Sequence, residues 1–489
     1  MLDIHKLSIK GAHDGLKAKD FTSVELTRAY LDRIKKYNGQ LNAYLTITDD
    51  IAISQAKNAD ENIKSGKQLK PLEGIPCAVK DIFVTKNVRT TASSKMLENF
   101  VPPYESTTTQ RLLSQGMVML GKTNCDAFAF GASTENSGYG PSKNPWNTKK
   151  VPGGSSGGSA VAVSAGLASY ALGTDTGGSI RQPAALCGLT GLKLTYGLGS
   201  RYGLIAMASS FDTPGPMAKT VEDCALVLQH MAGFDENDGT TFNHTIPDYS
   251  KSLNSDIKGK KIAVLSQSYG DGVETDVKTA VKTAAETLAS MGADVEEISM
   301  PDLKYGISVY YVLVPSEISS NMAKFDSVRF GHRTENYNSM IDMQSKSRGE
   351  SLEDEVKRRI MLGNFALASG YYDAYYLKAA KVRTVIKQKF AQAFQKYDAL
   401  ISPTSPTVAF DIGSKSDDPL AMYLADIFTC PVNSAGIPAL SVPCGFSKDK
   451  LPIGMQIIGK SLDEETIINI GFAYQQVTDW HNYVPDLKE

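Results

Sequence analysis

The sequence has few cysteines and no excess of charge of either sign. Its six cysteines lie far apart and form no Cys-x-x-Cys pair, which argues against a zinc ribbon and against a dense disulfide framework. We therefore expect six reduced, mostly buried thiols. The 51 basic and 53 acidic side chains give a net charge of −2. A protein that binds nucleic acid directly usually has a basic excess, so direct binding of phosphates is not predicted as its main role.

Long apolar segments are also missing. No run approaches the roughly 18 apolar residues that a membrane-spanning helix needs. The first residues, MLDIHK, lack the basic patch and apolar stretch of a secretory signal. These absences predict a soluble protein of the cytoplasm.

The 489 residues, 42% hydrophobic and 21% charged, suit a globular protein with a large core. Alternating helical and strand patterns predict an α/β layer structure. We expect one domain over residues 1–489, with an N-terminal helical segment at about 1–65 and a polar surface crossing at about 236–258. Helices are predicted at 20–37 (capped by Ser23), 50–65, 106–115, from 159, from about 179, at 277–291 and at 352–395. Strands are predicted at 42–47, 75–79, 117–120, 261–265, 295–298, 398–402, 439–444 and 452–458.

Two runs rich in glycine and serine interrupt this pattern. They are GGSSGGS at 153–159 and GTDTGGSIR at 173–181, and the first follows a long loop predicted over 131–158. Glycines leave the backbone bare, so its N–H groups can approach a ligand closely. A serine there could attack a carbonyl carbon while the amides hold the oxyanion. The two runs therefore point to acyl transfer.

Two common motifs match these regions only as strings. GMVMLGKT at 116–123 fits the P-loop pattern, but its middle is a buried strand rather than a loop of exposed amides. GGSSG at 153–157 fits the nucleophile elbow, but no strand precedes it. The elbow also needs a histidine, and none lies in a glycine-rich or loop-apex setting. The histidines are His5, His13, His230, His244, His332 and His481.

A neutral lysine is the alternative base for a serine. Burial disfavours the ammonium and lowers the pKa of the amine. Lys80 is the candidate because it closes the apolar run GIPCAV at 74–79. On position alone, an ordinary lysine in solvent at the end of a strand is the favoured interpretation.

The spacing of Lys80, Ser155 and Ser179 resembles the Lys–Ser–Ser triad of the amidase signature family. The stretch 153–191 matches that signature closely, with Asp175 and Arg181 in register. Within the family, the chain is most similar to the glutaminase subunits of tRNA-dependent amidotransferases, over about residues 20–482. Further matching segments are 41–44, 131–137, 144–147, 200–204, 357–363, 369–376, 454–459 and 479–481. The resemblance implies a large mixed β-sheet core covered by helices on both faces.

The resemblance also implies roles for individual residues. Ser179 would attack the side-chain amide of glutamine, Ser155 would relay its proton to neutral Lys80, and the peptide between residues 154 and 155 would be cis. The oxyanion would lie among backbone amides of the second run. A cation and an anion would bind the α-carboxylate and α-ammonium of glutamine. The residues implied are Thr176, Gly177 and Gly178 for the oxyanion hole, Arg359 and Asp426 for the substrate, and Tyr310 as a further pocket residue.

The same resemblance implies partners and no metal or cofactor in this chain. A larger B subunit would bind tRNA, with ATP and Mg²⁺, and a small C subunit would complete a heterotrimer. The acceptor would be Glu-tRNA(Gln), Asp-tRNA(Asn) or both. Three other interpretations stay open here: a stand-alone amidase acting on a small amide, a non-catalytic scaffold, and a P-loop NTPase.

Overall fold

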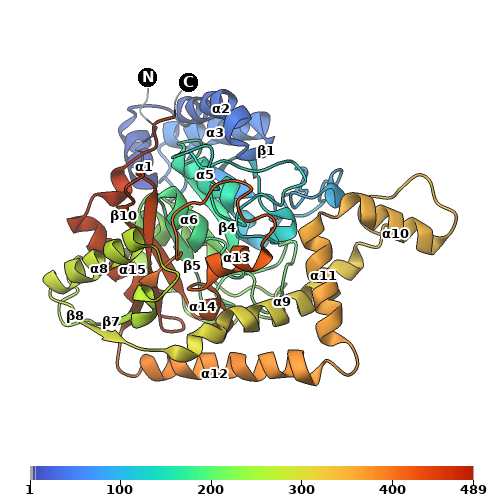
Figure 1. Cartoon of the computed structure of the whole chain (residues 1–489). Helices are drawn as coiled ribbons and strands as arrows, with labels where there is room; N and C mark the ends of the chain where they lie inside the picture. The colour runs from blue at the N-terminus through green and yellow to red at the C-terminus, as the bar shows by residue number, and fades with distance from the viewer. Residues whose placement is uncertain (1–3, 6, 488–489) are drawn as a thin grey trace.

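The computed structural model describes residues 4–5 and 7–487, and within them eleven strands form one mixed sheet flanked by helices (Figure 1). The strand order is β1-β3-β2-β4-β6-β5-β10-β11-β9-β7-β8. The strands are β1 (Tyr44–Ile47), β2 (Pro76–Lys80), β3 (Val118–Thr123), β4 (Tyr170–Asp175), β5 (Thr190–Lys193), β6 (Thr213–Ala218), β7 (Lys261–Leu265), β8 (Asp294–Ile298), β9 (Ala399–Pro403), β10 (Ala439–Phe446) and β11 (Pro452–Gly459). The expected large mixed sheet is confirmed.

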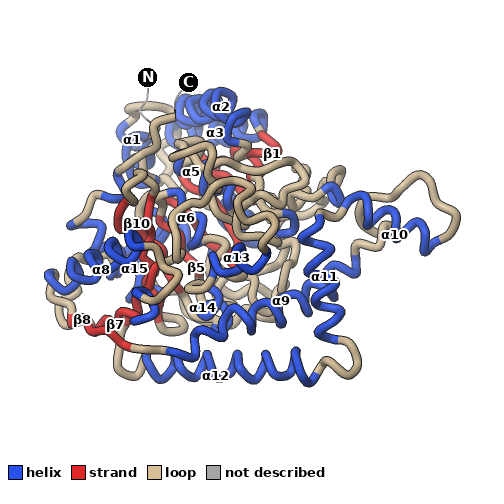
Figure 2. The backbone as a smooth tube through the Cα atoms, viewed as in Figure 1, coloured by secondary structure: helices blue, strands red, loops and turns tan. Residues whose placement is uncertain are grey.

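In Figure 2, most of the red strands lie in the middle of the molecule among blue helices, while β7 and β8 lie at the lower left edge. The α-helices are α1 (Ile9–Ala18), α2 (Ser23–Leu41), α3 (Asp49–Lys64), α4 (Thr107–Ser114), α5 (Gly157–Ser164), α6 (Arg181–Cys187), α7 (Val221–Met231), α8 (Thr275–Ser290), α9 (Gly306–Asn321), α10 (Met340–Ser351), α11 (Asp354–Leu367), α12 (Lys378–Ala393), α13 (Pro419–Tyr423), α14 (Cys430–Ala435) and α15 (Glu464–Val477). Short 3₁₀ turns join several of them, including η8 (Leu424–Asp426).

The helix predicted over 20–37 begins at Ser23 and has a different cap. Thr22, not Ser23, accepts the hydrogen bond from the backbone N–H of Glu25, and the Glu25 side chain accepts in return from the Thr22 N–H. This reciprocal capping box satisfies two amides that the helix itself leaves free. The helix also continues past Asn38 to Leu41, because the left-handed Asn42 ends it instead. Ser23 is buried and donates to the Gly74 carbonyl.

Three parallel strands position the chemistry. β2 pairs in parallel with both β3 and β4, with Val79 opposite Leu172. Parallel neighbours end at the same edge of a sheet. Lys80, the last residue of β2, therefore lies beside the end of β4, where the second glycine-serine run begins. All residues of both strands are buried.

The segment predicted as helical over 352–395 consists of α11, a π-helical turn (Asp373–Leu377) and α12. In Figure 1, α12 runs along the lower edge of the molecule and α10 extends outward on the right. α9 packs against both α11 and α12. No helix in the described ranges is both long and apolar enough to cross a lipid bilayer. All six cysteines are free and buried, as expected.

Candidate active site

Lys80 is fully buried at the end of β2. Its Nζ lies 2.8 Å from the Oγ of Ser155, 2.9 Å from the Oγ of Ser156 and 2.8 Å from the Oγ1 of Thr174. Burial lowers the pKa of the Lys80 ammonium to about 8. Neighbouring carboxylates raise this pKa, but by less than burial lowers it. At pH 7 roughly a tenth of Lys80 is therefore uncharged and can accept a proton from a hydroxyl, and this fraction rises with pH. The alternative interpretation, that Lys80 is an ordinary lysine in solvent, is therefore wrong.

Ser155 comes from the long loop before α5. The peptide bond between Gly154 and Ser155 is cis, as the family resemblance implied. The Ser155 carbonyl accepts a hydrogen bond from the backbone N–H of Asp126 at 3.3 Å, which ties the loop to the end of β3. Ser155 and Ser156 are fully buried. The loop thus presents two hydroxyls to one amine.

Ser179 retains more exposure than Lys80 and Ser155, at 6% against 0% for each. The backbone N–H of Ser156 donates to the Ser179 carbonyl at 3.2 Å, so the two glycine-serine runs lie against each other. Of these three residues, Ser179 is therefore the most accessible from solvent. The helix expected to open near it begins at Arg181.

The loop between β4 and Ser179 has free amides. Among the described residues, the backbone N–H groups of Thr176, Gly177 and Gly178 have no hydrogen-bond acceptor. The Gly177 carbonyl is held by the Thr429 hydroxyl at 2.6 Å. Gly178 has a φ of 140°, and a Cβ there would lie 2.3 Å from the Thr429 Oγ1. Only glycine fits this position. Three N–H groups thus remain available for an oxyanion.

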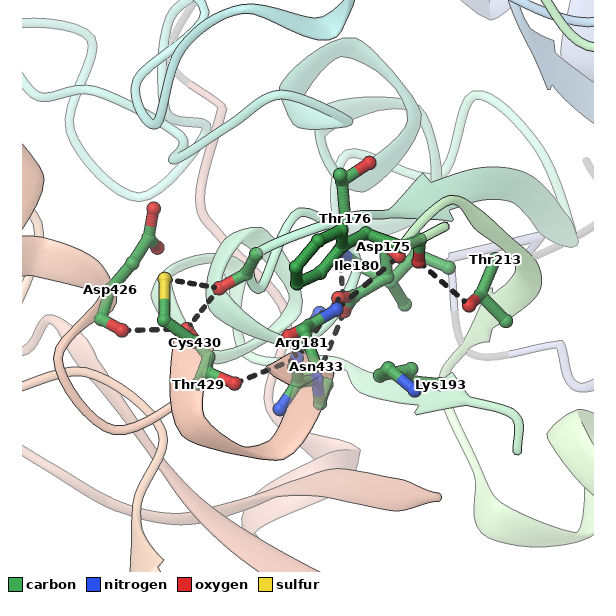
Figure 3. Close-up of polar contacts among 12 residues, drawn as sticks. Asp175, Thr176, Ile180, Arg181, Lys193, Thr213, Asp426, Thr429, Cys430 and Asn433 are labelled. Atoms are coloured by element: carbon green, nitrogen blue, oxygen red, sulfur yellow. Dashed lines mark hydrogen bonds and ion pairs between the residues drawn. The ribbon is translucent and has the colours of Figure 1, made fainter. Parts of the chain in front are cut away.

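A fully buried ion pair between Arg181 and Asp175 holds this loop in place (Figure 3). Arg181 donates from Nη2 to the Asp175 Oδ1 and from Nε to the Asp175 Oδ2, both at 2.9 Å. Burial opposes ionisation of Asp175, but the Arg181 charge and its hydrogen bonds outweigh burial and lower the pKa of Asp175 to about 2. Asn433 on α14 and Gln456 on β11 accept further hydrogen bonds from Arg181. The ends of the second run are therefore tied to the centre of the sheet.

Arg359 lies on α11 and is 2% exposed. Its Nε donates to the Glu355 Oε1 at 2.7 Å. Its guanidinium carbon lies 5.3 Å and 5.7 Å from the ring centres of Tyr311 and Tyr423. Arg359 is therefore a buried and oriented cation rather than half of a surface ion pair.

Asp426 ends the turn η8 and is 5% exposed. Its Oδ1 is buried without a hydrogen-bond partner among the described residues. A Cβ on Gly178 would lie 3.2 Å from that oxygen, and one on Gly177 would lie 2.6 Å from the Tyr310 ring. Burial raises the pKa of Asp426 to about 8. Asp426 and Tyr310 thus face the free-amide loop.

Three contributors are absent from the sequence-based prediction. Ser156 and Thr174 form hydrogen bonds with Lys80. Each lies inside one of the two glycine-serine runs, so a closer examination of the runs could have suggested both residues. Asp212 accepts from the Thr176 hydroxyl at 2.7 Å and from the backbone amides of Met207 and Ala208. It precedes β6, whose first residue pairs with Asp175, and only this strand pairing brings it to the site.

The P-loop string is a buried strand, as predicted. Residues 118–123 form β3, and Lys122 is fully buried. Its Nζ lies 3.4 Å from Asp81 and donates to the Phe83 carbonyl and the Thr90 hydroxyl. It cannot reach a phosphate, which removes the NTPase interpretation. Likewise, no strand directly precedes residues 153–157, so they do not form a nucleophile elbow.

The depressed pKa of Lys80 gives a pH prediction. Because the neutral amine accepts the proton, kcat/KM for amide hydrolysis should rise with pH through about 8, falling about tenfold per pH unit well below it. Lys80→Met should lower kcat by about 10² to 10⁴ and leave the thermal unfolding temperature close to that of the wild type. A wild-type profile that is flat between about pH 6.5 and 9 would contradict a neutral-lysine base.

Comparisons with known proteins identify the family of this chain. The family model described as Amidase matches residues 25–468. The chain belongs to the amidase family.

Within the family, the chain is 51% identical to the A subunit of glutamyl-tRNA(Gln) amidotransferase from Acaryochloris marina, covering 98% of this chain and 100% of that protein. It is 52% identical to the same subunit from Chloroflexus aggregans, covering 100% and 99%. The crystal structure of that subunit from Thermotoga maritima superposes with a TM-score of 0.83, 39% identity and coverage of 100% and 99%.

Proposed function

We propose that this chain is the glutaminase subunit of a tRNA-dependent amidotransferase. The observation that carries the proposal is a pair of buried ionisable groups, Arg359 on α11 and Asp426, of which Asp426 faces the free-amide loop. Arg359 offers a cation for an α-carboxylate, and Asp426 offers an unpartnered acceptor for an α-ammonium. A stand-alone amidase that acts on simple amides has no use for such a pair. The near-full-length identity to the A subunits of glutamyl-tRNA(Gln) amidotransferases supports the same conclusion.

In the proposed reaction, the Ser179 Oγ attacks the side-chain amide carbon of glutamine. Ser155 takes the proton from Ser179 and gives its own to neutral Lys80, which lies 2.8 Å away. The amides of Thr176, Gly177 and Gly178 stabilise the oxyanion, and losing one such donor typically costs about 3 kcal/mol of transition-state stabilisation. Lys80, through Ser155, returns the proton to the leaving nitrogen, and ammonia departs.

Water then completes the cycle. It attacks the glutamyl ester on Ser179 and loses a proton to the same relay. Glutamate leaves as the Ser179 hydroxyl is restored. The net reaction is glutamine plus water giving glutamate plus ammonia, and the atoms of every step come from the substrate, water and these side chains.

The ammonia needs an acceptor on another protein. The described residues contain no group of three or more His, Cys, Asp or Glu side chains placed to bind a metal ion. The net charge of −2 also offers no general excess of cations for tRNA. We propose a B subunit that binds ATP, Mg²⁺ and tRNA, and a C subunit that completes the heterotrimer in the cytoplasm. Glu-tRNA(Gln) is the proposed acceptor, with Asp-tRNA(Asn) as a second.

Co-expression with the chromosomal neighbours of its gene tests this proposal. A tagged chain should co-purify with two further subunits, and the complex should convert Glu-tRNA(Gln) to Gln-tRNA(Gln) with glutamine and ATP. The Asp-tRNA(Asn) acceptor is tested in a parallel reaction. A chain that stays alone and hydrolyses simple amides better than glutamine would instead establish the stand-alone amidase.

Replacing Arg359 by alanine tests the substrate pocket. The α-carboxylate would lose a charge-assisted hydrogen-bond partner worth about 1.5–3 kcal/mol, so KM for glutamine should rise about tenfold or more. The matched probe is γ-aminobutyramide, which is glutamine without its α-carboxylate. Its KM should not change in the variant. An unchanged KM for glutamine would remove Arg359 from the pocket.

A further inference from the structure

Glu355 lies one helical turn before Arg359 on α11 and is 7% exposed. Its Oε1 accepts from the Arg359 Nε at 2.7 Å, and its Oε2 accepts from Arg358. Residues four apart lie on one face of a helix, so the backbone itself sets the distance between Glu355 and Arg359. A buried carboxylate thus holds a buried cation on a rigid element.

This contact uses only one edge of the guanidinium. Arginine has five N–H donors in a planar fork, one on Nε and four on the two terminal nitrogens. Among the described residues, neither terminal nitrogen of Arg359 donates a hydrogen bond. Glu355 therefore fixes the plane of the group and leaves its terminal donors for a ligand carboxylate, which binds best to two parallel N–H groups.

Tyr423 links Glu355 to the segment that carries Asp426. Its hydroxyl donates to the Glu355 Oε1 at 3.2 Å, and its ring stacks on Tyr311 at 3.7 Å between centres. Tyr423 ends α13, and η8, with Asp426 at its end, follows directly. Glu355 therefore joins the helix that carries the cation to the segment that carries the acid.

We propose that Glu355 is a positioning residue that sets the specificity of this site for amides bearing an α-carboxylate. It acts through Arg359 by fixing the guanidinium plane, and through Tyr423 by fixing the separation between the cation and Asp426. The inference rests on the proposed glutaminase function and names the device by which that site selects its substrate.

The test compares glutamine with γ-aminobutyramide in the full chain co-expressed with its partners. Glu355→Ala should raise KM for glutamine about tenfold and leave kcat within about twofold, because a lost hydrogen bond to a charged group is worth about 1.5–3 kcal/mol. Its KM for γ-aminobutyramide should stay unchanged. The ratio of the two kcat/KM values should therefore fall toward that of Arg359→Ala.

Three further variants separate positioning from stability. Glu355→Gln keeps an oxygen for the Arg359 Nε and should retain most of the specificity. Tyr423→Phe loses only the hydroxyl and should show a smaller loss of specificity than Glu355→Ala. Glu353→Gln is the matched control beside the same helix, since Glu353 accepts from the Ser94 hydroxyl and the Lys95 amide instead. Its specificity ratio should equal that of the wild type.

Several results would overturn the inference. A wild-type specificity ratio in Glu355→Ala would do so, as would an equal rise of KM for both substrates. If Glu355→Ala does not fold, an unchanged ratio in Tyr423→Phe, or loss in Glu355→Gln as complete as in Arg359→Ala, is decisive against it. A wild-type chain with no activity on glutamine would overturn the proposed function and this inference together.

Discussion

Replacing Ser179 by alanine is expected to lower kcat for glutamine hydrolysis by a factor on the order of 10⁴ or more, since the loss of a nucleophile that acts with its base removes the covalent route entirely. Ser179 is 6% exposed and follows the loop with three free amides. No other hydroxyl is predicted to replace it, because Ser155 is fully buried against Lys80. Ammonia release under saturating glutamine is the measurement.

Two controls make the Ser179→Ala result specific. The variant should co-purify with its partners, and the complex should still amidate tRNA when ammonium salt replaces glutamine. Ser164→Ala serves as the matched substitution, because the Ser164 hydroxyl donates to the Cys187 carbonyl away from Lys80. Wild-type ammonia release by Ser179→Ala would show that the nucleophile lies elsewhere.

Replacing Arg181 by methionine is expected to have the largest effect on stability, about 3–5 kcal/mol of the free energy of unfolding. Arg181 and Asp175 are both 0% exposed, and the substitution leaves the Asp175 carboxylate buried without its cation. Thermal unfolding measures the loss. Arg329→Met is the matched control: Arg329 is 65% exposed in its pair with Asp326, and exposed pairs contribute about 0–1 kcal/mol.

The pH dependence of that loss has a definite sign. Arg181 helps to hold the pKa of Asp175 at about 2, against an ordinary value of 3.8. The lowered pKa stabilises the fold above the ordinary value, and this contribution disappears as pH falls toward 2. The difference between wild type and Arg181→Met should therefore be largest near neutral pH and shrink in acid. A difference that grows as pH falls would contradict the assignment of charge to this pair.

The parts of the site that are local in sequence were predictable. The apolar run before Lys80 forms a buried strand, and the two glycine-serine runs meet around its amine. Short apolar runs that follow glycine or proline indicate strands from the local sequence alone. The proposed substrate residues, Arg359 and Asp426, were implied by the family resemblance alone, because no local pattern distinguishes them from surface charges.

The long-range supports were not predictable. Asn433 and Gln456 reach Arg181 from more than 250 positions away, with sequence separations of 252 and 275. Asp212 meets Thr176 only because β6 returns antiparallel to β4. Such contacts depend on sheet order, and β6 and β5 lie between β4 and β10 although β10 is more than 200 residues later in the chain. Periodicity in one sequence carries no information about that order.

Acid quenching of the complex during glutamine turnover, followed by mass spectrometry of its peptides, tests the central claim most directly. The account predicts a glutamyl ester on the peptide that contains Ser179, at the Ser179 hydroxyl and in no other position. A glutamyl group on Ser155, Ser156 or another side chain, or turnover with no acyl-enzyme under conditions that trap such esters, would contradict it.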